Sequence, residues 1–167
     1  MSQCPTCGRP LSDHDLHIRF ELPGPVLDST AGVGAPGTWL SHEDANSSVM
    51  MQVPGVGPFV RALLRVNLSE AHMITFGVWV SISPAGLQST FAVWHDDAYI
   101  DLQLDGVLAN DIPPWKLVGS PVRLRVLDKD QTPYCVSSSD PVLESVLSST
   151  WPHQEILAAN VGRELLN

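Results

Sequence analysis

The stretch VRALLRVNLSEAHMITFGVWVSI, residues 60–82, decides the fold of this chain. Apolar side chains occupy every second position in two runs, which is the pattern of β-strands that bury one face. The apolar positions are Val60, Ala62, Leu64, Val66 and Leu68 in the first run and Ile74, Phe76, Val78, Val80 and Ile82 in the second. Only residues 69–72 separate the runs, a connection short enough for a β-hairpin. The pattern therefore predicts two antiparallel strands that meet in a tight turn.

Weaker signals on either side of this hairpin complete the expected fold class. Further strands are expected at residues 17–22, 49–53, 99–104 and 122–127. Helices are expected after Ser83-Pro84 and Asp140-Pro141, because a capping side chain followed by proline favours a helix start, and a last helix is expected near the C-terminus. We interpret Leu87, Phe91 and Trp94 as the core-facing stripe of the first helix. This order of elements predicts an α+β fold, with a mainly antiparallel sheet of about five to six strands and about two to three helices.

Length and composition are those of one domain. The chain has 167 residues, 44% of them hydrophobic, which is enough to bury a sizeable core. We divide it into a cysteine-bearing head at residues 1–16, a long loop rich in glycine, proline and serine at residues 23–48, and an α+β core at residues 49–167. No apolar run approaches the ~20 residues of a membrane span, and the polar start is unlike a secretory signal. Three cysteines are an odd number, unlike a disulfide framework, so we expect a reduced, cytoplasmic protein.

A formal net charge of −9 limits the class of partner. Nucleic-acid-binding proteins usually carry a basic surface, so binding to nucleic acid is not expected. An acidic surface keeps a protein soluble and can steer it toward basic partners. We expect another protein as the partner and no association with a membrane.

The N-terminal head contains the best candidate for a metal site, Cys4-Pro5-Thr6-Cys7-Gly8. Two cysteines at this spacing can bring both thiolates to one ion, and the glycine permits the turn of the chain. A structural zinc ion takes four nitrogen or sulfur ligands, and His14 and His17 are the nearest further suppliers. We therefore predict a zinc-knuckle-like head with Cys4, Cys7, His14 and His17 as ligands. The side chains that can replace either histidine, if the fold brings one close, are Cys135, His42, His72 and His153.

Two other interpretations of the head remain open. Thioredoxin-like redox chemistry also uses Cys-x-x-Cys, but there the motif follows a strand and opens a helix, whereas here it stands at the terminus with Pro10 just beyond. The two thiols can also be unligated, which leaves a purely structural N-terminus without metal. A bound zinc ion would instead add its binding free energy to folding and order this segment.

Basic residues and one tryptophan mark a second candidate site. Several of them point away from the apolar row of their expected strands and so share one sheet face. These residues are Arg61, Arg65, Trp79, Arg123 and Arg125. Acidic residues have the same parity, so cross-strand ion pairs on a solvated face are the simpler interpretation. A pocket for a small molecule or an enzyme substrate on this face is the alternative.

Motifs for catalysis are missing from the sequence. Residues 32–37 match the letters of the dinucleotide motif G-x-G-x-x-G, but they neither follow a clear strand nor open a helix, so we interpret them as a loop. His95-Asp96-Asp97 and Glu43-Asp44 are interpreted as solvated loop charges. An enzyme is therefore not favoured.

Several blocks resemble a family of small bacterial proteins known as domain of unknown function 2199. The head Cys4–Gly8 is similar to the N-terminal motif of that family, and residues 76–83, FGVWVSIS, are similar to its most recognisable block. Residues 106–113, GVLANDIP, and 139–143, SDPVL, are similar to two later segments. The resemblance implies a bacterial intracellular protein with one compact α+β domain, and it implies no reaction. The cluster of cysteine and histidine residues in the head, and not the resemblance, predicts a protein-interaction or regulatory module stabilised by zinc and responsive to zinc supply.

Overall fold

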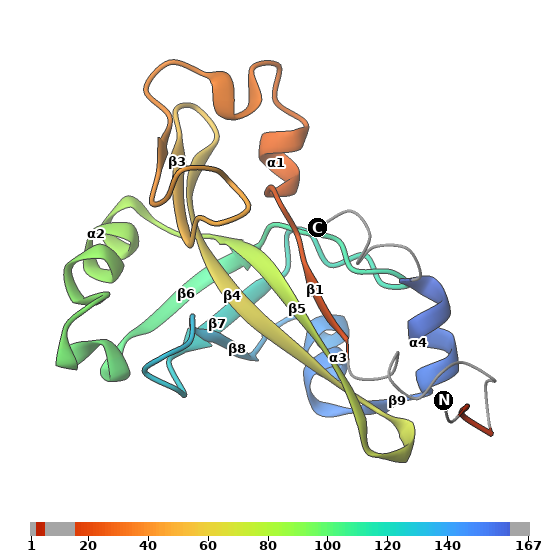
Figure 1. Ribbon diagram of the computed structural model, residues 1–167. Coiled ribbons are helices and arrows are strands. Elements are labelled where there is room, and N and C mark those ends of the chain that lie inside the picture. Colours follow the sequence, from red (N-terminus) through yellow and green to blue (C-terminus); the bar gives the residue numbers. More distant parts are fainter. Residues whose placement is uncertain (1–2, 6–15, 161–167) are drawn as a thin grey trace.

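The hairpin expected within residues 60–82 forms the longest strand pair of the molecule. The computed structural model describes residues 3–5 and 16–160. Strand β4 (Gly57–Leu68) and strand β5 (His72–Ser81) are antiparallel, with Phe59 opposite Ser81 at one end and Leu68 opposite His72 at the other. They run as a long twisted ribbon that ends in a turn (Figure 1). The prediction of two antiparallel strands joined by a tight turn is confirmed.

This hairpin is one wall of a closed five-stranded barrel. The other barrel strands are β6 (Gln103–Leu108), β7 (Pro121–Arg125) and β8 (Tyr134–Ser137). From β5 to β8, each strand is antiparallel to the one before it. Strand β8 then pairs in parallel with β4, through Tyr134 opposite Leu63, and closes the ring. Closure removes the exposed edges that an open sheet would leave.

Four short strands extend the barrel wall. They are β1 (His17–Arg19), β2 (Trp39–Leu40), β3 (Met50–Val53) and β9 (Thr150–Trp151). Strand β3 adds to β4 and β2 adds to β3, both antiparallel, whereas β1 lies parallel to β5 and β9 lies parallel to β4. The described residues therefore form a nine-stranded sheet. The strands at residues 17–22 and 49–53 are thus present as β1 and β3, whereas β2, β8 and β9 are not expected from the sequence, because two to four residues are too few to show alternation.

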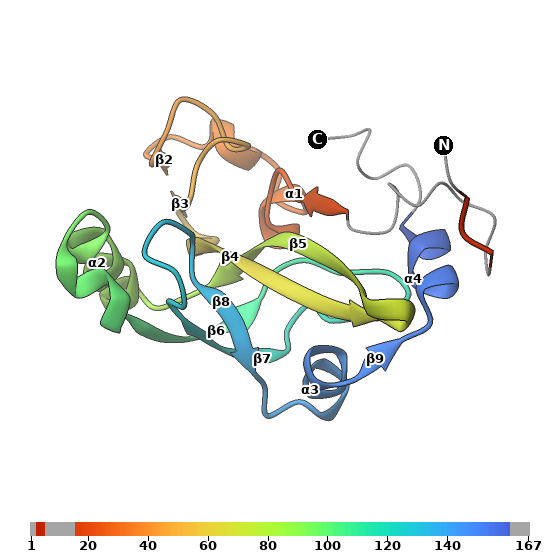
Figure 2. The same cartoon turned by 60° about the horizontal axis from the view of Figure 1, so that its bottom comes forward.

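The α-helices lie outside the barrel. They are α1 (Gly24–Leu27), α2 (Pro84–Val93), α3 (Pro141–Ser148) and α4 (His153–Ala159). Both proline-marked starts are confirmed, because Ser83 accepts a hydrogen bond from the N–H of Gly86 and Asp140 accepts one from Leu143. Helix α2 lies at one end of the barrel, and α3 and α4 lie toward the hairpin turn (Figure 2). None of the helices in the described part of the chain is both long and apolar enough to cross a bilayer. The architecture is α+β.

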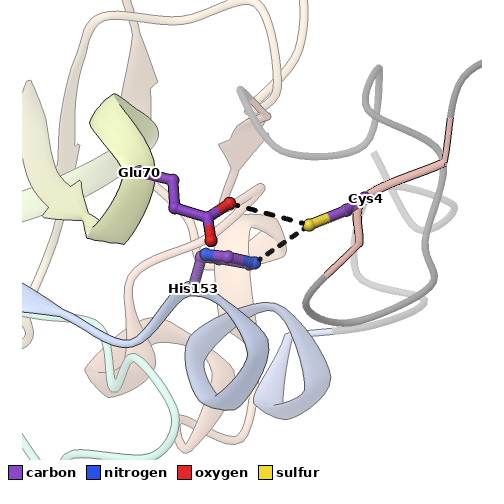
Figure 3. A group of neighbouring side chains, drawn as sticks. All are labelled: Cys4, Glu70 and His153. Carbon is purple, nitrogen blue, oxygen red and sulfur yellow. Dashed lines mark hydrogen bonds between the residues drawn. The ribbon is translucent and has the colours of Figure 1, made fainter.

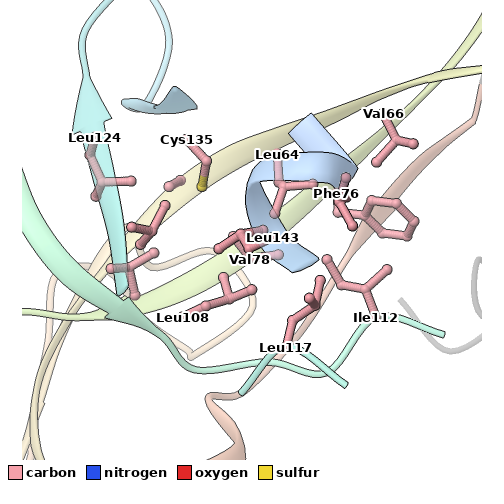
Figure 4. Close-up of a cluster of buried hydrophobic side chains, with 14 of the residues drawn as sticks. Leu64, Val66, Phe76, Val78, Leu108, Ile112, Leu117, Leu124, Cys135 and Leu143 are labelled. Carbon is pink, nitrogen blue, oxygen red and sulfur yellow. The ribbon is translucent and has the colours of Figure 1, made fainter. Parts of the chain in front are cut away.

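The barrel interior holds the main hydrophobic core. All the alternating apolar residues of the hairpin belong to this core. Leu108 of β6, Leu124 of β7 and Leu143 of α3 pack with them (Figure 4). Full burial of a side chain of this size contributes about 1.5–3 kcal/mol relative to exposure, so this cluster dominates the stability of the barrel.

The opposite face of the hairpin is also covered. A second buried cluster contains Phe59 and Trp79 of the hairpin. Packed with them are Val26 of α1, Met51 of β3 and Ala45, which lies in the turn before β3. The segment at residues 23–48 thus forms α1 and β2 and packs over this face, although its composition suggests a loop. The hairpin is therefore buried on both faces near Trp79.

Two sequence-based expectations about local structure are wrong. The strand expected at residues 99–104 begins only at Gln103, after a 3-10 turn over Asp97–Asp101. Asp96 accepts a hydrogen bond from the N–H of Ala98 and starts that turn, so local capping prevails over the alternating pattern. Phe91, expected to face the core from α2, is 64% exposed, whereas Leu87, one turn earlier, is buried.

Candidate metal centre

The turn of the long hairpin has an unusual backbone. Between β4 and β5, residues Ser69–Ala71 form a 3-10 turn in which Glu70 has φ = 62° and Ala71 has φ = 63°. This left-handed region is uncommon for residues other than glycine, asparagine and aspartate, and such a conformation costs of the order of 1–3 kcal/mol. The turn carries the Glu70 side chain to one side of the hairpin tip, where it meets the N-terminal segment (Figure 3).

Ser69 holds a histidine beside this turn. His153 is the first residue of α4 and is 1% exposed. Its backbone N–H donates to Ser69 Oγ over 3.0 Å, and its ring Nδ1 lies 2.7 Å from the same oxygen. The ring of His72 packs edge-on against it, with the centroids 5.4 Å apart. These contacts fix the ring so that Nε2 is directed at Cys4 (Figure 3).

Cys4 completes a group of three potential ligands. Its side chain is 2% exposed, and its Sγ lies 3.4 Å from His153 Nε2 and 3.8 Å from Glu70 Oε2. The three ligand atoms all lie within 4.8 Å of one another. They come from the N-terminal segment, the hairpin turn and α4, which are far apart in the sequence.

The two distances from Cys4 Sγ are close to those of one tetrahedral ion. With a Zn–S bond of about 2.3 Å and Zn–N and Zn–O bonds of about 2.0–2.2 Å, a tetrahedral angle places the sulfur about 3.5–3.7 Å from the other two atoms. The observed 3.4 Å and 3.8 Å lie on either side of this range. Cysteine, histidine and glutamate are all ligands that zinc accepts in proteins. An Nδ1–H donated to Ser69 Oγ would direct the Nε2 lone pair at the ion, as is common for ligating histidines.

The structure brings together only part of the predicted ligand set. Cys4 is in the group, whereas Cys7 and His14 lie outside the described residues. His17 lies on β1 with its side chain exposed, and it is not in the group. His153, an alternative from the sequence, occupies the histidine position, because α4 folds back against the hairpin turn.

Glu70 is the ligand candidate that the sequence analysis missed. In the sequence it is only part of a short connection, and no motif links it to Cys4. The available signal is its place in the three-residue connection of the hairpin, Ser69–Ala71, where a residue with positive φ is normally glycine.

Within the described part of the chain, the remaining alternatives from the sequence do not join the group. Cys135 is buried in the barrel on β8, opposite Leu124 of β7, and burial raises its pKa to about 12. A thiol with so high a pKa is a poor source of thiolate. His42 is exposed in the turn after β2, and its Nδ1 lies 3.0 Å from Ser41 Oγ.

The chain was also compared with known proteins. A family model described as "Uncharacterized protein conserved in bacteria (DUF2199)" matches residues 3–142. The chain belongs to this family. The resemblance noted from the cysteine head and the FGVWVSIS and GVLANDIP blocks is thereby confirmed. No curated protein and no solved structure was found that matches the chain.

The region shared with the DUF2199 family contains two of the three candidate ligands. Cys4 and Glu70 fall inside the matched residues 3–142, and His153 follows them on α4. Arg61 and Trp79, from the second candidate site, also fall inside the match.

The four arginines and the tryptophan that were expected to share one sheet face do not form one exposed surface. Arg61 and Trp79 are both 0% exposed, and the Arg61 guanidinium lies 4.0 Å from the centroid of the Trp79 ring. The second hydrophobic cluster covers this part of the hairpin, which strand alternation alone does not reveal. The prediction of a shared solvated face is therefore wrong for these two residues, whose side chains are buried.

Arg61 is instead a buried anchor for the backbone. It donates to the carbonyls of Ala45 at 3.1 Å and Gly77 at 3.3 Å. Its other acceptors are the carbonyls of Phe20, Asn46 and Ser48. Burial, with a smaller repulsion from Arg19, lowers the pKa of Arg61 to about 9.

The other three residues of the predicted face are exposed on the barrel wall. Arg123 pairs with Asp105 across β6 and β7, with Nε 3.0 Å from Oδ1. Arg65 lies over the ring of Tyr134 at 4.5 Å. Arg125, on β7, lies opposite Tyr134 of β8. An exposed pair such as Arg123–Asp105 contributes about 0–1 kcal/mol, in line with the simpler interpretation of this face.

Proposed function

We propose that this protein is an interaction module whose N-terminal head is fastened to the barrel by a zinc ion bound to Cys4, Glu70 and His153. The observation that carries the proposal is the convergence of these three side chains, with spacings close to those of a tetrahedral site. Cys7, at knuckle spacing from Cys4, is assigned as the fourth ligand.

The burial of two of the three ligands favours a structural ion over a catalytic one. Catalytic zinc keeps a position open for water or substrate, whereas structural zinc is enclosed by protein ligands. Cys4 and His153 are 2% and 1% exposed, whereas Glu70 is exposed, so in this proposal Cys7 supplies the fourth ligand that encloses the ion. The binding free energy of such an ion acts as folding free energy for the segment it holds.

Fastening the head gives the protein a surface that depends on zinc. In this proposal the head and the segment at residues 23–48 form much of the recognition surface for a partner protein. Loss of the ion would release the head while the barrel core remains, so partner binding would follow the supply of zinc.

Metal analysis of purified variants tests the proposal. We expect the wild-type protein, purified without chelator, to hold about one zinc ion per chain, and Cys4→Ser and His153→Ala to lose it. Cys135→Ser is the matched control, because it removes a buried cysteine outside the group and should keep the zinc. Cobalt substitution then reports the ligands, since a thiolate-to-cobalt charge-transfer band should be present in wild type and weaker in Cys4→Ser. Wild-type protein without zinc, or full zinc content in Cys4→Ser, would refute the site.

A further inference from the structure

Two large aromatic side chains stand exposed on the side of the molecule formed by β2 and α2. Phe91 is 64% exposed and Trp39 is 38% exposed. Their rings meet edge to face, with centroids 5.9 Å apart. Contiguous apolar surface of this kind, rimmed by polar residues, is typical of binding sites.

A hollow lies beside this aromatic pair. It has a volume of about 480 Å³, and its lining includes Trp39, His42, Phe91, Trp94 and Asp96. A neighbouring hollow of about 410 Å³ shares Trp94 and Asp96 and adds residues of the following turn, Asp97 and Ile100, together with Lys129. We call the two hollows together the aromatic groove.

Two carboxylates line the aromatic groove, and two more lie in the turn that contributes His42 to its lining. Asp96 and Asp97 line it, and Glu43 and Asp44 directly follow His42 in the turn after β2. All four are exposed. Hydrogen bonds from Ser47, chiefly from its backbone N–H, lower the pKa of Asp44, so this group is charged at neutral pH. Lys129 is the one lysine or arginine among the residues that line the groove, and His42 and His95 also line it.

Aromatic faces beside carboxylates suit a cation. A guanidinium or ammonium group over an aromatic ring gains about 0.5–1 kcal/mol at an exposed site and about 2 kcal/mol when desolvated. We propose that the aromatic groove binds an arginine- or lysine-bearing segment of a partner protein. This inference names the partner class for the interaction role proposed above and rests on that role, but not on the zinc ion.

Charge argues against other occupants of the groove. A second copy of the chain would bring another net charge of −9 to an acidic surface. A nucleic acid would bring its phosphates to the same carboxylates. A basic segment is attracted at long range by the net charge and at short range by the rings and by Asp96 and Asp97.

A pair of matched peptides tests the inference. The probe is a fluorescein-labelled peptide of alternating arginine, leucine and glycine residues, and its counterpart has glutamine at every arginine. Fluorescence anisotropy with zinc-loaded protein should show saturable binding of the arginine peptide that weakens with salt, and weaker binding of the glutamine peptide. No saturable binding, or equal affinity for both peptides, would overturn the inference.

Variants place the binding in the groove. Phe91→Ala and, independently, Trp39→Ala should each weaken binding of the arginine peptide by about tenfold. Val142→Ala is the control, because Val142 is 50% exposed on α3, outside the lining of either hollow, and should bind like wild type. Unchanged binding in both aromatic variants, with far-ultraviolet circular dichroism like that of wild type, would contradict the assignment.

The same titration separates this inference from the zinc proposal. Zinc bound without peptide binding refutes the groove alone. Peptide bound by zinc-free Cys4→Ser as tightly as by wild type supports the groove and removes the link between zinc and partner binding. Self-association that Phe91→Ala abolishes, in protein that does not bind the peptide, would identify a second copy as the occupant and reject the basic segment.

Discussion

At the scale of single residues, two strained positions and one buried thiol distinguish this protein. Glu70 and Ala71 are the two described residues other than glycine with positive φ, and they sit side by side at the hairpin turn. Glu70 contacts Cys4, whereas the side chain of Ala71 is only a methyl group. The strain at Glu70 is therefore tied to the candidate metal centre, and the strain at Ala71 is not.

Replacing each strained residue by glycine separates strain from ligation. We expect Ala71→Gly to raise the free energy of unfolding by about 1 kcal/mol, because glycine adopts this φ without steric cost, and to leave zinc content unchanged. Glu70→Gly relieves the same strain but removes a ligand, so it should lower zinc affinity. Urea unfolding in the presence of chelator measures the change in the free energy of unfolding. Competition titration with zinc measures the change in zinc affinity. Equal zinc affinity in the two variants would exclude Glu70 as a ligand.

The buried thiol of Cys135 makes the free energy of unfolding depend on pH in the alkaline range. Burial raises the pKa of its thiol from the ordinary value of 9.0 to about 12. The thiol form therefore contributes stability that is fully present below pH 9.0 and is lost as the pH rises through about 12. We expect the free energy of unfolding of wild type to fall relative to that of Cys135→Ala between these values.

Comparing the two proteins isolates the thiol. Arg61 and Tyr99 also titrate at alkaline pH, but they are present in both proteins and cancel from the difference. Urea unfolding at several pH values measures the difference in the free energy of unfolding between wild type and Cys135→Ala. A difference between wild type and variant that does not change with pH would contradict the buried, neutral thiol.

At the scale of elements, Arg61 connects the hairpin to the segments that cover it. From β4 it reaches the carbonyl of Gly77 on β5 and those of Phe20, after β1, and of Ala45 in the turn before β3. Arg19 of β1 donates to the carbonyl of Asn46 over 2.7 Å, in the same turn. Two guanidinium groups thus hold the turn at residues 44–48 against the sheet.

Removing the Arg61 guanidinium should loosen this covering layer. We expect Arg61→Met to lower the free energy of unfolding by about 3 kcal/mol or more, because it leaves several buried carbonyls without a donor. Arg61→Lys should rescue only part of the loss, since one ammonium group cannot reach acceptors spread in a plane. Arg65→Met is the control on the same strand, and its exposed contact with Tyr134 should contribute less than about 1 kcal/mol. Equal effects of the two methionine variants, measured by urea unfolding, would contradict the anchor.

At the scale of the whole molecule, the barrel core and the metal centre are separate. The main core lies inside the barrel and contains none of the three candidate ligands. The three candidate ligands lie in the N-terminal segment, the hairpin turn and the start of α4, so an ion bound there would join these three segments. Removing it should therefore not unfold the protein, unlike the removal of zinc from an isolated zinc finger.

Chelation should produce local changes only. With chelator, we expect amide hydrogen exchange to increase around residues 3–5, the hairpin turn and the start of α4, while the centres of β4 and β5 stay protected. The far-ultraviolet circular dichroism should be nearly unchanged. Cys135→Ser should respond to chelator like wild type. Cys4→Ser should show the increased amide hydrogen exchange even when no chelator is added. Global loss of protection on chelation would show that the ion supports the barrel itself.

The sequence predicts the parts of this fold that depend on neighbours along the chain. The alternation in residues 60–82 predicts the hairpin and its inner face, and the capping residues Ser83 and Asp140 mark two helix starts. These signals arise within a few residues, because strand geometry sets the alternation of side chains and hydrogen bonds to the local backbone set where a helix begins. They do not reveal that β8 returns to β4, because that pairing joins distant segments.

What the sequence by itself determined is the α+β class, the central hairpin, the choice of Cys4 as a candidate metal ligand and the negative net charge. Only the tertiary structure decided that Glu70 and His153 meet Cys4, that Arg61 and Trp79 are buried, and that Phe91 is exposed beside Trp39. The reason is physical. Local patterns report which face of an element is apolar, but the neighbours of that face depend on how the barrel closes and on what packs over it. Cys4 and His153 are 149 residues apart in the sequence, and only that closure and packing bring their side chains within 3.4 Å.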